Sequence, residues 1–218
     1  MREQIIQQVG AEKIIVIIRG VSSEKILPVA QALYDGGVRM IEVTFDQKDV
    51  EKQKETVECI RKIAEHFQGK VSVGAGTVTS PKLVEMAAEA GAQYIISPDT
   101  NEAVIRKTRE LGLVSMPGAL TPTEVMNAHH WGADFVKLFP VGNLGAGYVK
   151  AVKAPLNHVK LLAVGGVNAD NVMDFLTAGC CGAGVGGNLV NKTWIEAGEY
   201  EKLTEAAREL MQAVKGKG

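Results

Sequence analysis

Short runs of β-branched and aliphatic residues alternate with longer amphipathic stretches along the whole chain. The short runs predict buried strands, and stretches with apolar residues at helical spacing predict helices. The expected strands cover residues 14–18, 39–44, 71–75, 94–96, 113–116, 134–139, 159–164 and 183–185. The expected helices cover residues 2–8, 24–35, 51–66, 101–110, 147–154, 169–178 and 199–215, and two more begin after Ser80 and Thr121.

The predicted helices begin and end with a repeated set of signals. Ser80 is followed by a proline, and Thr121 opens a Thr-Pro-Thr-Glu capping box. Glycine ends helix after helix directly before the next strand, at Gly36, Gly37, Gly91, Gly112, Gly132 and Gly179. A glycine just past the last helical turn satisfies the open carbonyl groups there. Its recurrence indicates an array of strand–helix units.

Eight strand-then-helix units with nearly continuous apolar strands indicate a parallel sheet that is buried on both faces. In a chain of 218 residues, this pattern predicts an α/β protein with a closed (β/α)₈ (TIM) barrel. The barrel is expected to form one domain over residues 1–218, with a leading N-terminal helix. A doubly wound open sheet is the alternative, but no Gly-x-Gly-x-x-Gly follows the first strand.

Composition narrows the range of partners. Hydrophobic residues make up 46% and charged residues 22%, as in a soluble globular protein. The formal net charge of −1 gives no electrostatic reason to expect a nucleic acid or an anionic membrane as a partner. No charged-then-apolar leader and no apolar run of the length of a membrane helix is apparent, so a cytoplasmic location is expected. Cys59, Cys180 and Cys181 are expected to be reduced. We predict no metal and no cofactor.

Lys137 lies in the middle of an otherwise apolar, strand-like run. Burial of an ammonium group is costly and is usually relieved by a lowered pKa. A neutral amine can attack a carbonyl group, so Lys137 is a candidate Schiff-base lysine for a 2-oxo acid. Alternation places Phe135, Lys137 and Phe139 on one face of the strand. The alternative is a lysine at a strand end whose stem packs while its ammonium reaches water.

Glu42 lies in the middle of the second predicted strand, between two aliphatic residues. Inside a barrel, it would be a near neighbour of Lys137 in the same low-dielectric cavity. A carboxylic acid beside a Schiff-base lysine can transfer the protons that the reaction needs. The alternative is a buried Glu–Lys ion pair with a structural role.

Glycines and an arginine mark the ends of other strands. Gly165-Gly166 follows the seventh strand and Gly186-Gly187 the eighth, where barrels commonly bind phosphate. Arg19 ends the first strand and is a candidate anion ligand, or forms a salt bridge at the rim. Thr77, after the third strand, offers a hydroxyl and an amide to a carboxylate, or simply forms a turn.

Seven segments, taken in order, resemble the KDPG/KHG aldolase family of class I aldolases over nearly the whole chain. They are residues 41–44 (IEVT), 74–78 (GAGTV), 96–98 (ISP), 116–118 (MPG), 136–140 (VKLFP), 165–167 (GGV) and 184–187 (GVGG). The resemblance implies a trimer of (β/α)₈ barrels. It also implies cleavage of 2-keto-3-deoxy-6-phosphogluconate to pyruvate and glyceraldehyde 3-phosphate, or of 4-hydroxy-2-oxoglutarate to pyruvate and glyoxylate.

The same resemblance assigns roles to residues. It implies Lys137 as the Schiff-base lysine and Glu42 as the proton shuttle. Thr77 would bind the pyruvate carboxylate, Pro98 and Phe139 would line the pocket, and both Gly-Gly turns would hold phosphate. Two positions depart from the family pattern: Asp46 stands where an arginine is common, and Asn188 where a phosphate-binding serine is common. Arg19 would then have to replace the missing arginine, while the amide of Asn188 can still donate a hydrogen bond.

Two other functions fit parts of the pattern. A phosphosugar isomerase or synthase would use the glycine turns with Glu42 as a simple base, and its activity would survive Lys137→Arg. A barrel that only binds a sugar phosphate would account for Asp46 and Asn188, but it would have no use for a lysine–glutamate pair. The intact lysine–glutamate pair and the site motifs favour a pyruvate-forming lyase, which is the leading interpretation.

Overall fold

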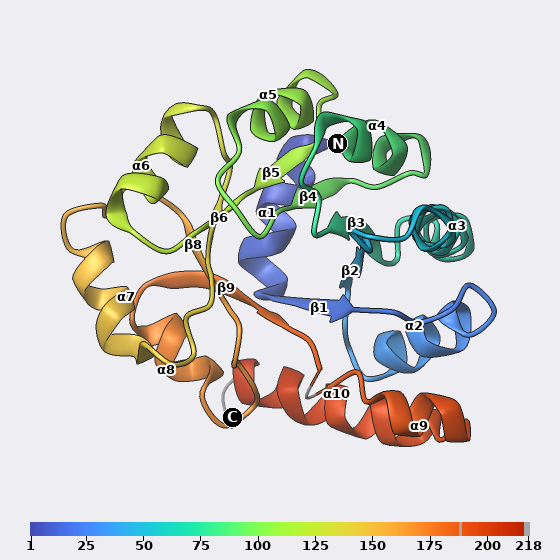
Figure 1. Ribbon diagram of the computed structural model, residues 1–218. Helices are drawn as coiled ribbons and strands as arrows, with labels where there is room; N and C mark the ends of the chain where they lie inside the picture. Colours follow the sequence, from blue (N-terminus) through green and yellow to red (C-terminus); the bar gives the residue numbers. More distant parts are fainter. Residues whose placement is uncertain (188, 216–218) are drawn as a thin grey trace.

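The computed structural model describes residues 1–187 and 189–215, and its centre is a nine-stranded, all-parallel sheet that curves into a nearly closed barrel (Figure 1). The strands run in the order β5-β4-β3-β2-β1-β9-β8-β7-β6. Their bounds are β1 Ile14–Ile18, β2 Met40–Thr44, β3 Ser72–Gly76, β4 Tyr94–Ile96, β5 Val114–Met116, β6 Gly118–Ala119, β7 Val136–Leu138, β8 Leu161–Val164 and β9 Cys180–Val185. The predicted barrel fold is confirmed.

The ninth strand arises because the fifth strand extends beyond the predicted residues 113–116, and Pro117 divides it into two parts. The first part, β5, pairs with β4, and the second part, β6, pairs with β7. Proline has no N–H to donate, so a strand is interrupted where it occurs. Its carbonyl oxygen still accepts a hydrogen bond from the Lys137 N–H at 2.9 Å. The divided strand therefore joins the two ends of the sheet.

Most of the helices surround the strands (Figure 1). Their bounds are α1 Arg2–Glu12, α2 Ile26–Asp35, α3 Val50–Phe67, α4 Pro81–Glu89, α5 Glu102–Glu110, α6 Pro122–His130, α7 Gly145–Lys153, α8 Val172–Thr177, α9 Lys192–Ala197 and α10 Tyr200–Lys215. The predicted caps at Ser80 and Thr121 are present, the latter as a complete capping box. No helix in the described part of the chain is long and apolar enough to cross a membrane.

Two helix predictions differ from the structure. Helix α8 begins at Val172 rather than at Ala169, because the Asn168 side chain accepts the N–H groups of Asp170 and Asn171 and holds a turn there. Helix α9 was not predicted. Single residues mark its start and its end: the Asn191 side chain caps its first turn, and Gly198 ends it with φ +73°.

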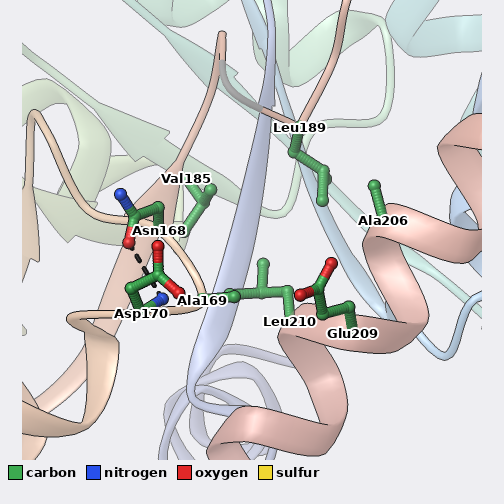
Figure 2. Close-up of a pocket in the computed structure, with 8 residues that line it drawn as sticks. All are labelled: Asn168, Ala169, Asp170, Val185, Leu189, Ala206, Glu209 and Leu210. Atoms are coloured by element: carbon green, nitrogen blue, oxygen red, sulfur yellow. Dashed lines mark hydrogen bonds between the residues drawn. The ribbon is translucent and has the colours of Figure 1, made fainter.

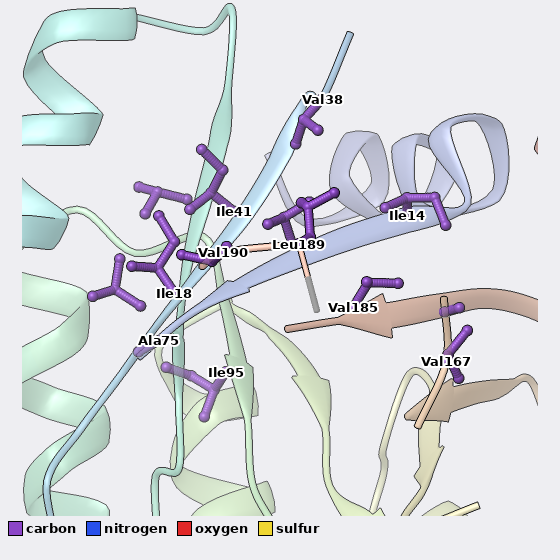
Figure 3. Packing of buried hydrophobic residues seen from close by; sticks show 14 of the residues in the cluster. Ile14, Ile18, Val38, Ile41, Ala75, Ile95, Val167, Val185, Leu189 and Val190 are labelled. Carbon is purple, nitrogen blue, oxygen red and sulfur yellow. The ribbon is translucent and has the colours of Figure 1, made fainter. Parts of the chain in front are cut away.

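Apolar residues form two clusters, one on each side of the sheet. The larger cluster fills the space between strands and helices and includes Ile14, Ile18, Val38, Ile41 and Ile95 (Figure 3). The smaller cluster fills the barrel interior, where Tyr94, Phe135 and Leu162 meet Ile5 and Val9 of α1. Helix α1 thus closes the barrel at the amino ends of the strands, which leaves the opposite end open.

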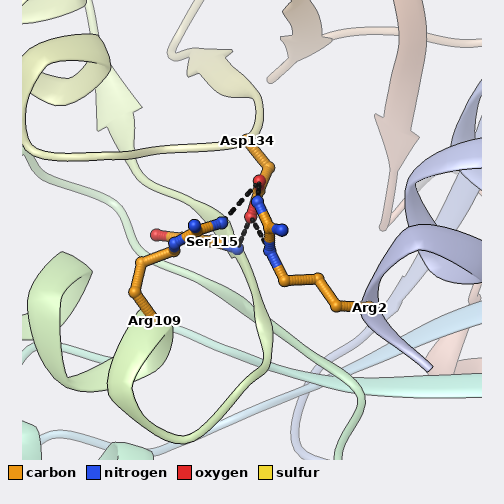
Figure 4. Close-up of polar contacts among 4 residues, drawn as sticks. All are labelled: Arg2, Arg109, Ser115 and Asp134. Atoms are coloured by element: carbon orange, nitrogen blue, oxygen red, sulfur yellow. Dashed lines mark hydrogen bonds and ion pairs between the residues drawn. The ribbon is translucent and has the colours of Figure 1, made fainter.

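An ionic contact fixes α1 in this position. Asp134, just before β7, accepts hydrogen bonds from the Arg2 guanidinium, from Arg109 of α5 at 3.0 Å and from the Ser115 N–H at 2.9 Å (Figure 4). The Asp134 side chain is 5% exposed, whereas both arginines reach solvent. Burial is the largest influence on this carboxyl and raises its pKa, although the Ser115 N–H and Arg2 oppose the shift.

Candidate active site

A cavity of about 370 Å³ lies at the open, carboxyl end of the barrel strands. Ten of the predicted site residues line it: Arg19, Glu42, Thr77, Pro98, Lys137, Phe139, Gly165, Gly166, Gly186 and Gly187. They come from seven strands or the loops that follow them, so the barrel brings together groups that are far apart in sequence. The eleventh, Asn188, lies outside the described residues.

Lys137 extends into this cavity from β7. The predicted alternation is confirmed, because Phe135 belongs to the interior cluster while Val136 and Leu138 belong to the outer one. Lys137 is 6% exposed, and its Nζ lies 4.7 Å from the centre of the Phe139 ring. Burial lowers the pKa of the amine, Glu42 opposes this shift, and Arg19 adds to it. A lowered pKa provides more of the neutral amine that attacks a carbonyl.

Glu42 faces the same cavity from β2 and is 1% exposed. Burial raises the pKa of its carboxyl group, and the positive charges of Lys137 and Arg19 oppose this shift. A carboxyl group with a raised pKa can hold a proton for part of a reaction cycle and act as a general acid. Burial therefore shifts the pKa values of this acid and this amine toward one another.

Lys137 and Glu42 do not form a close ion pair. Among the described residues, neither side chain has an ion-pair partner within 4.0 Å, and neither has a side-chain hydrogen bond, although each shifts the pKa of the other. A buried pair with a purely structural role would need direct contact to offset its desolvation. The two groups instead line an open cavity with their polar ends unpaired, as groups that receive a substrate would.

Arg19 and Thr77 meet at the rim of the cavity. The Arg19 guanidinium donates a hydrogen bond to Thr77 Oγ1 at 3.2 Å. Thr77 has φ +56°, a left-handed conformation that is unusual for a β-branched residue. The Thr77 carbonyl accepts a hydrogen bond from Gln47 Nε2 at 2.6 Å, which helps to hold the conformation. Strained backbone of this kind is concentrated at functional sites.

The glycine turn after β8 packs against the loop after β7. Gly165 and Gly166 have φ values of +91° and +83°, which favour glycine. A Cβ atom at Gly142 would stand 2.5 Å from the Gly165 carbonyl oxygen, so the two loops approach with backbone against backbone.

Comparisons with known proteins agree with this geometry. The family model for KDPG and KHG aldolase matches residues 5–206. The chain belongs to this aldolase family. It is 34% identical over 206 residues to 2-dehydro-3-deoxy-6-phosphogalactonate aldolase of Escherichia coli (strain K12), with 91% of this chain and 96% of that protein covered. It is also 34% identical to the KHG/KDPG aldolase of the same strain, with 88% and 87% covered. Aldolases are lyases, and so is this enzyme.

Solved structures show the same relationship. A native KDPGal structure superposes with a TM-score of 0.84 at 32% identity, covering 93% of this chain and 94% of that one. KDPG aldolase from Legionella pneumophila, captured with pyruvate as a covalent carbinolamine, superposes with a TM-score of 0.83 at 26% identity, covering 92% and 95%. Pyruvate thus forms a covalent carbinolamine on an aldolase with this fold.

The structure shows what Asp46 contacts at the position where the family pattern has an arginine. The Asp46 side chain accepts the N–H groups of Lys48 at 2.8 Å and Asp49 at 3.0 Å, and these hydrogen bonds lower its pKa. Asp46 therefore holds the loop between β2 and α3 and does not line the cavity that contains Lys137. Arg19 is the cation that the described residues place in this cavity beside Lys137.

Sequence reasoning missed four residues that line the cavity around Lys137: Ile17, Val164, Val167 and Gly184. Strand alternation carried a signal for three of them, because Ile17 shares a strand face with Ile15, Val164 with Leu162, and Gly184 with Gly182. Val167 follows the glycine turn after β8, and no periodicity indicates where a loop residue points. These four residues give the cavity an apolar wall.

The enzyme has a further hollow outside the barrel. It measures about 270 Å³ and lies between the loop after β8 and α10, lined by residues such as Asn168, Asp170, Leu189 and Glu209 (Figure 2). Lys137 and Glu42 do not line it.

In the part of the chain that the structure describes, no group of three or more His, Cys, Asp or Glu side chains could hold a metal ion. Burial raises the pKa of the Cys59 and Cys180 thiols to about 12.

Proposed function

We propose that the enzyme is a class I aldolase in which Lys137 forms a Schiff base with a 2-oxo acid. The observation that carries the proposal is the position of two buried groups, Lys137 and Glu42, that face one cavity without pairing. The neutral amine attacks the C2 carbonyl and forms a carbinolamine. Glu42 donates a proton to the leaving hydroxyl, so that water departs and a protonated imine remains.

Cleavage follows from the charge on this imine. Glu42, now a carboxylate, accepts the proton of the C4 hydroxyl, and the C3–C4 bond breaks as its electron pair moves toward the imine. An aldehyde leaves, and an enamine stays on Lys137. Protonation at C3 and hydrolysis by water then release pyruvate and restore the amine. Glu42 is suited to the proton transfers of dehydration and cleavage because burial raises the pKa of its carboxyl group.

The other cavity residues are suited to hold the substrate. Arg19 and Thr77 offer a cation, a hydroxyl and an amide to the carboxylate of the pyruvyl part. Pro98 and Phe139 provide apolar contacts, and the turns at Gly165-Gly166 and Gly186-Gly187 offer backbone N–H groups to a phosphate. We further propose 2-keto-3-deoxy-6-phosphogluconate and 4-hydroxy-2-oxoglutarate as substrates, because relatives are named for both activities.

The test of the lysine is borohydride trapping with pyruvate, followed by intact and peptide mass spectrometry. A reduced pyruvyl adduct on Lys137 is expected, and it should be absent from Lys137→Arg. Lys160→Arg is the matched control. Lys160 directly precedes β8, the strand next to β7, and it is exposed at the amino end of that strand, away from the cavity. A folded wild-type protein that forms no adduct in excess pyruvate would overturn the Schiff-base mechanism.

The substrate is identified by measuring pyruvate release. The assay should compare 2-keto-3-deoxy-6-phosphogluconate, its galacto isomer and 4-hydroxy-2-oxoglutarate, since relatives are named for all three. The substrate with the highest kcat/KM is the natural one among them. We also propose that the chain acts as a single-domain cytoplasmic homotrimer, a state that light scattering after size exclusion would measure.

A further inference from the structure

Tyr94 is completely buried in the barrel interior, although it carries a polar hydroxyl group. It belongs to β4, which lies next to β3, and β3 lies next to β2, the strand of Glu42. Ile41, Ala75 and Ile95 of these three strands belong to the larger cluster outside the sheet (Figure 3). Because side chains alternate along a strand, Glu42 and Tyr94 both face the interior.

Two glycines of β3 make room for Tyr94 and for Glu42. A Cβ atom built on Gly74 would stand 2.1 Å from the Tyr94 ring, and one built on Gly76 would overlap the Glu42 carboxyl group. The two glycines are two positions apart on one strand, so they share its inner face. Tyr94 therefore crosses β3 from one side and Glu42 from the other, which brings the two side chains next to one another.

The Tyr94 hydroxyl holds the backbone from which Glu42 extends. It donates a hydrogen bond to the Ile41 carbonyl oxygen at 2.6 Å, and the Ser72 carbonyl oxygen lies farther away, at 3.3 Å. A hydroxyl has one hydrogen to donate, so the shorter contact is the main hydrogen bond. The Ile41 carbonyl and the Glu42 N–H belong to the same planar peptide unit. A hydroxyl that fixes this peptide also fixes the start of the Glu42 side chain.

The Tyr94 ring lies on the side of Glu42 that faces away from the cavity. Lys137 and Arg19 act on the carboxyl group from within the cavity, which Tyr94 does not line. Burial raises the pKa of the Tyr94 hydroxyl, and the charge of Glu42 raises it further, as expected for close neighbours. Glu42 is 1% exposed, and burial is the largest influence on its pKa. The ring therefore closes one side of the environment that keeps this carboxyl group dry.

We propose that Tyr94 is a positioning residue for Glu42: its hydroxyl orients the peptide from which Glu42 extends, and its ring keeps water from the carboxyl group. The inference rests on the proposed aldolase function, in which Glu42 transfers protons. Tyr94 acts through Glu42 and not on the substrate, because it does not line the cavity. A tyrosine with only a packing role would affect stability and leave the pKa of Glu42 and kcat unchanged.

The role of the ring is tested by NMR titration of the full chain with ¹³C-carboxyl-labelled glutamate, in which the Glu42 signal is the one missing from Glu42→Gln. Tyr94→Leu leaves space beside the Ile41 and Ser72 carbonyl oxygens and the Glu42 carboxyl group. Water occupies a buried space that offers it two to four polar partners. The pKa of Glu42 should then fall by about one unit, a part of the 3–5 units that full burial can produce. Tyr94→Phe keeps the ring and should leave this pKa raised.

The role of the hydroxyl is tested by the rate of pyruvate release. Tyr94→Phe should lower kcat about three- to tenfold, the effect of one hydrogen bond, and leave KM unchanged. Tyr148→Phe is the matched control, because the Tyr148 hydroxyl also donates to a backbone carbonyl, that of Leu120. Tyr148 belongs to α7 and does not line the cavity around Lys137, so this variant should retain the wild-type kcat.

Two results would overturn the role of Tyr94. One is an unchanged pKa of Glu42 in folded Tyr94→Leu, and the other is an equal kcat in Tyr94→Phe and Tyr148→Phe. If Tyr94→Leu does not fold, Tyr94→Met takes its place, because an unbranched side chain adapts to irregular space. A wild type that releases no pyruvate would refute the aldolase proposal, while the NMR titration would still decide whether Tyr94 shields Glu42.

Discussion

The carboxyl group of Glu42 lies against the backbone of Gly76. A Cβ atom built at position 76 would stand 1.6 Å from Glu42 Oε1 and 2.3 Å from its Cδ. The Glu42 carboxyl group can therefore occupy this position over β3 only because residue 76 has no side chain. The two residues belong to paired strands, in which Glu42 is opposite Gly74 and Thr44 is opposite Gly76.

Gly76→Ala should displace the Glu42 carboxyl while the barrel still folds, because the clash is with the far end of a flexible side chain. We expect kcat to fall about 10²–10⁴-fold, the usual contribution of a general acid–base group. Pyruvate release measures the loss, and thermal unfolding checks the fold. Gly10→Ala is the control: Gly10 lies in α1 with open space around its Cα, so activity should stay unchanged while stability rises by about 0.5–1 kcal/mol. An active Gly76→Ala variant would contradict the role of Glu42.

Removal of the charge of Arg19 should move both limbs of the pH–rate profile in one direction. Arg19 lowers the pKa of Glu42 and lowers that of Lys137, so both pKa values should rise in Arg19→Gln. The acid limb and the alkaline limb of kcat/KM are then both expected at higher pH than in the wild type. Arg19→Lys retains the charge and should restore both positions. Limbs that move in opposite directions would show that they belong to other groups.

Lys137 should make stability depend on pH in a specific range. Its folded pKa lies below the ordinary 10.5, so the unfolded chain binds more protons between the folded pKa and 10.5. The free energy of unfolding should therefore rise with pH across this range. In Lys137→Met this part of the rise should be missing, and Lys160→Met serves as a control for the loss of an exposed lysine. Urea unfolding at a series of pH values measures the difference, and equal slopes in all three proteins would refute the prediction.

Asp134→Ala should loosen the contact between α1 and the barrel. It removes the acceptor for Arg2, Arg109 and the Ser115 N–H, and leaves that buried N–H without a partner. We expect a loss of about 1–3 kcal/mol in the free energy of unfolding. Arg2→Ala should cost less, because the other two hydrogen bonds to Asp134 remain. Hydrogen exchange would locate the loss in α1, and protection unchanged there would argue against the contact as a tether.

Several features of the fold could be predicted from local pattern. The alternation of Phe135, Lys137 and Phe139 with apolar neighbours correctly placed the lysine inside the barrel, because side chains alternate strictly along a strand. Ser80 and Thr121 correctly marked helix starts, because a cap acts within one turn. Pro117 lay in a predicted loop, and its role in dividing a strand became visible only when β4 and β7 were seen to pair with its two sides.

By itself, the sequence determined the order of strands and helices, the inward face of the strand that carries Lys137, and the set of polar residues at the strand ends. Only the tertiary structure decided how those residues meet. Gly76 supports Glu42, Thr77 adopts a left-handed conformation beside Arg19, and Lys192 reaches Gly20 across 172 positions of the chain. The physical reason is range: backbone geometry and caps act within a few residues, whereas distance, burial and charge balance depend on which distant segments pack together.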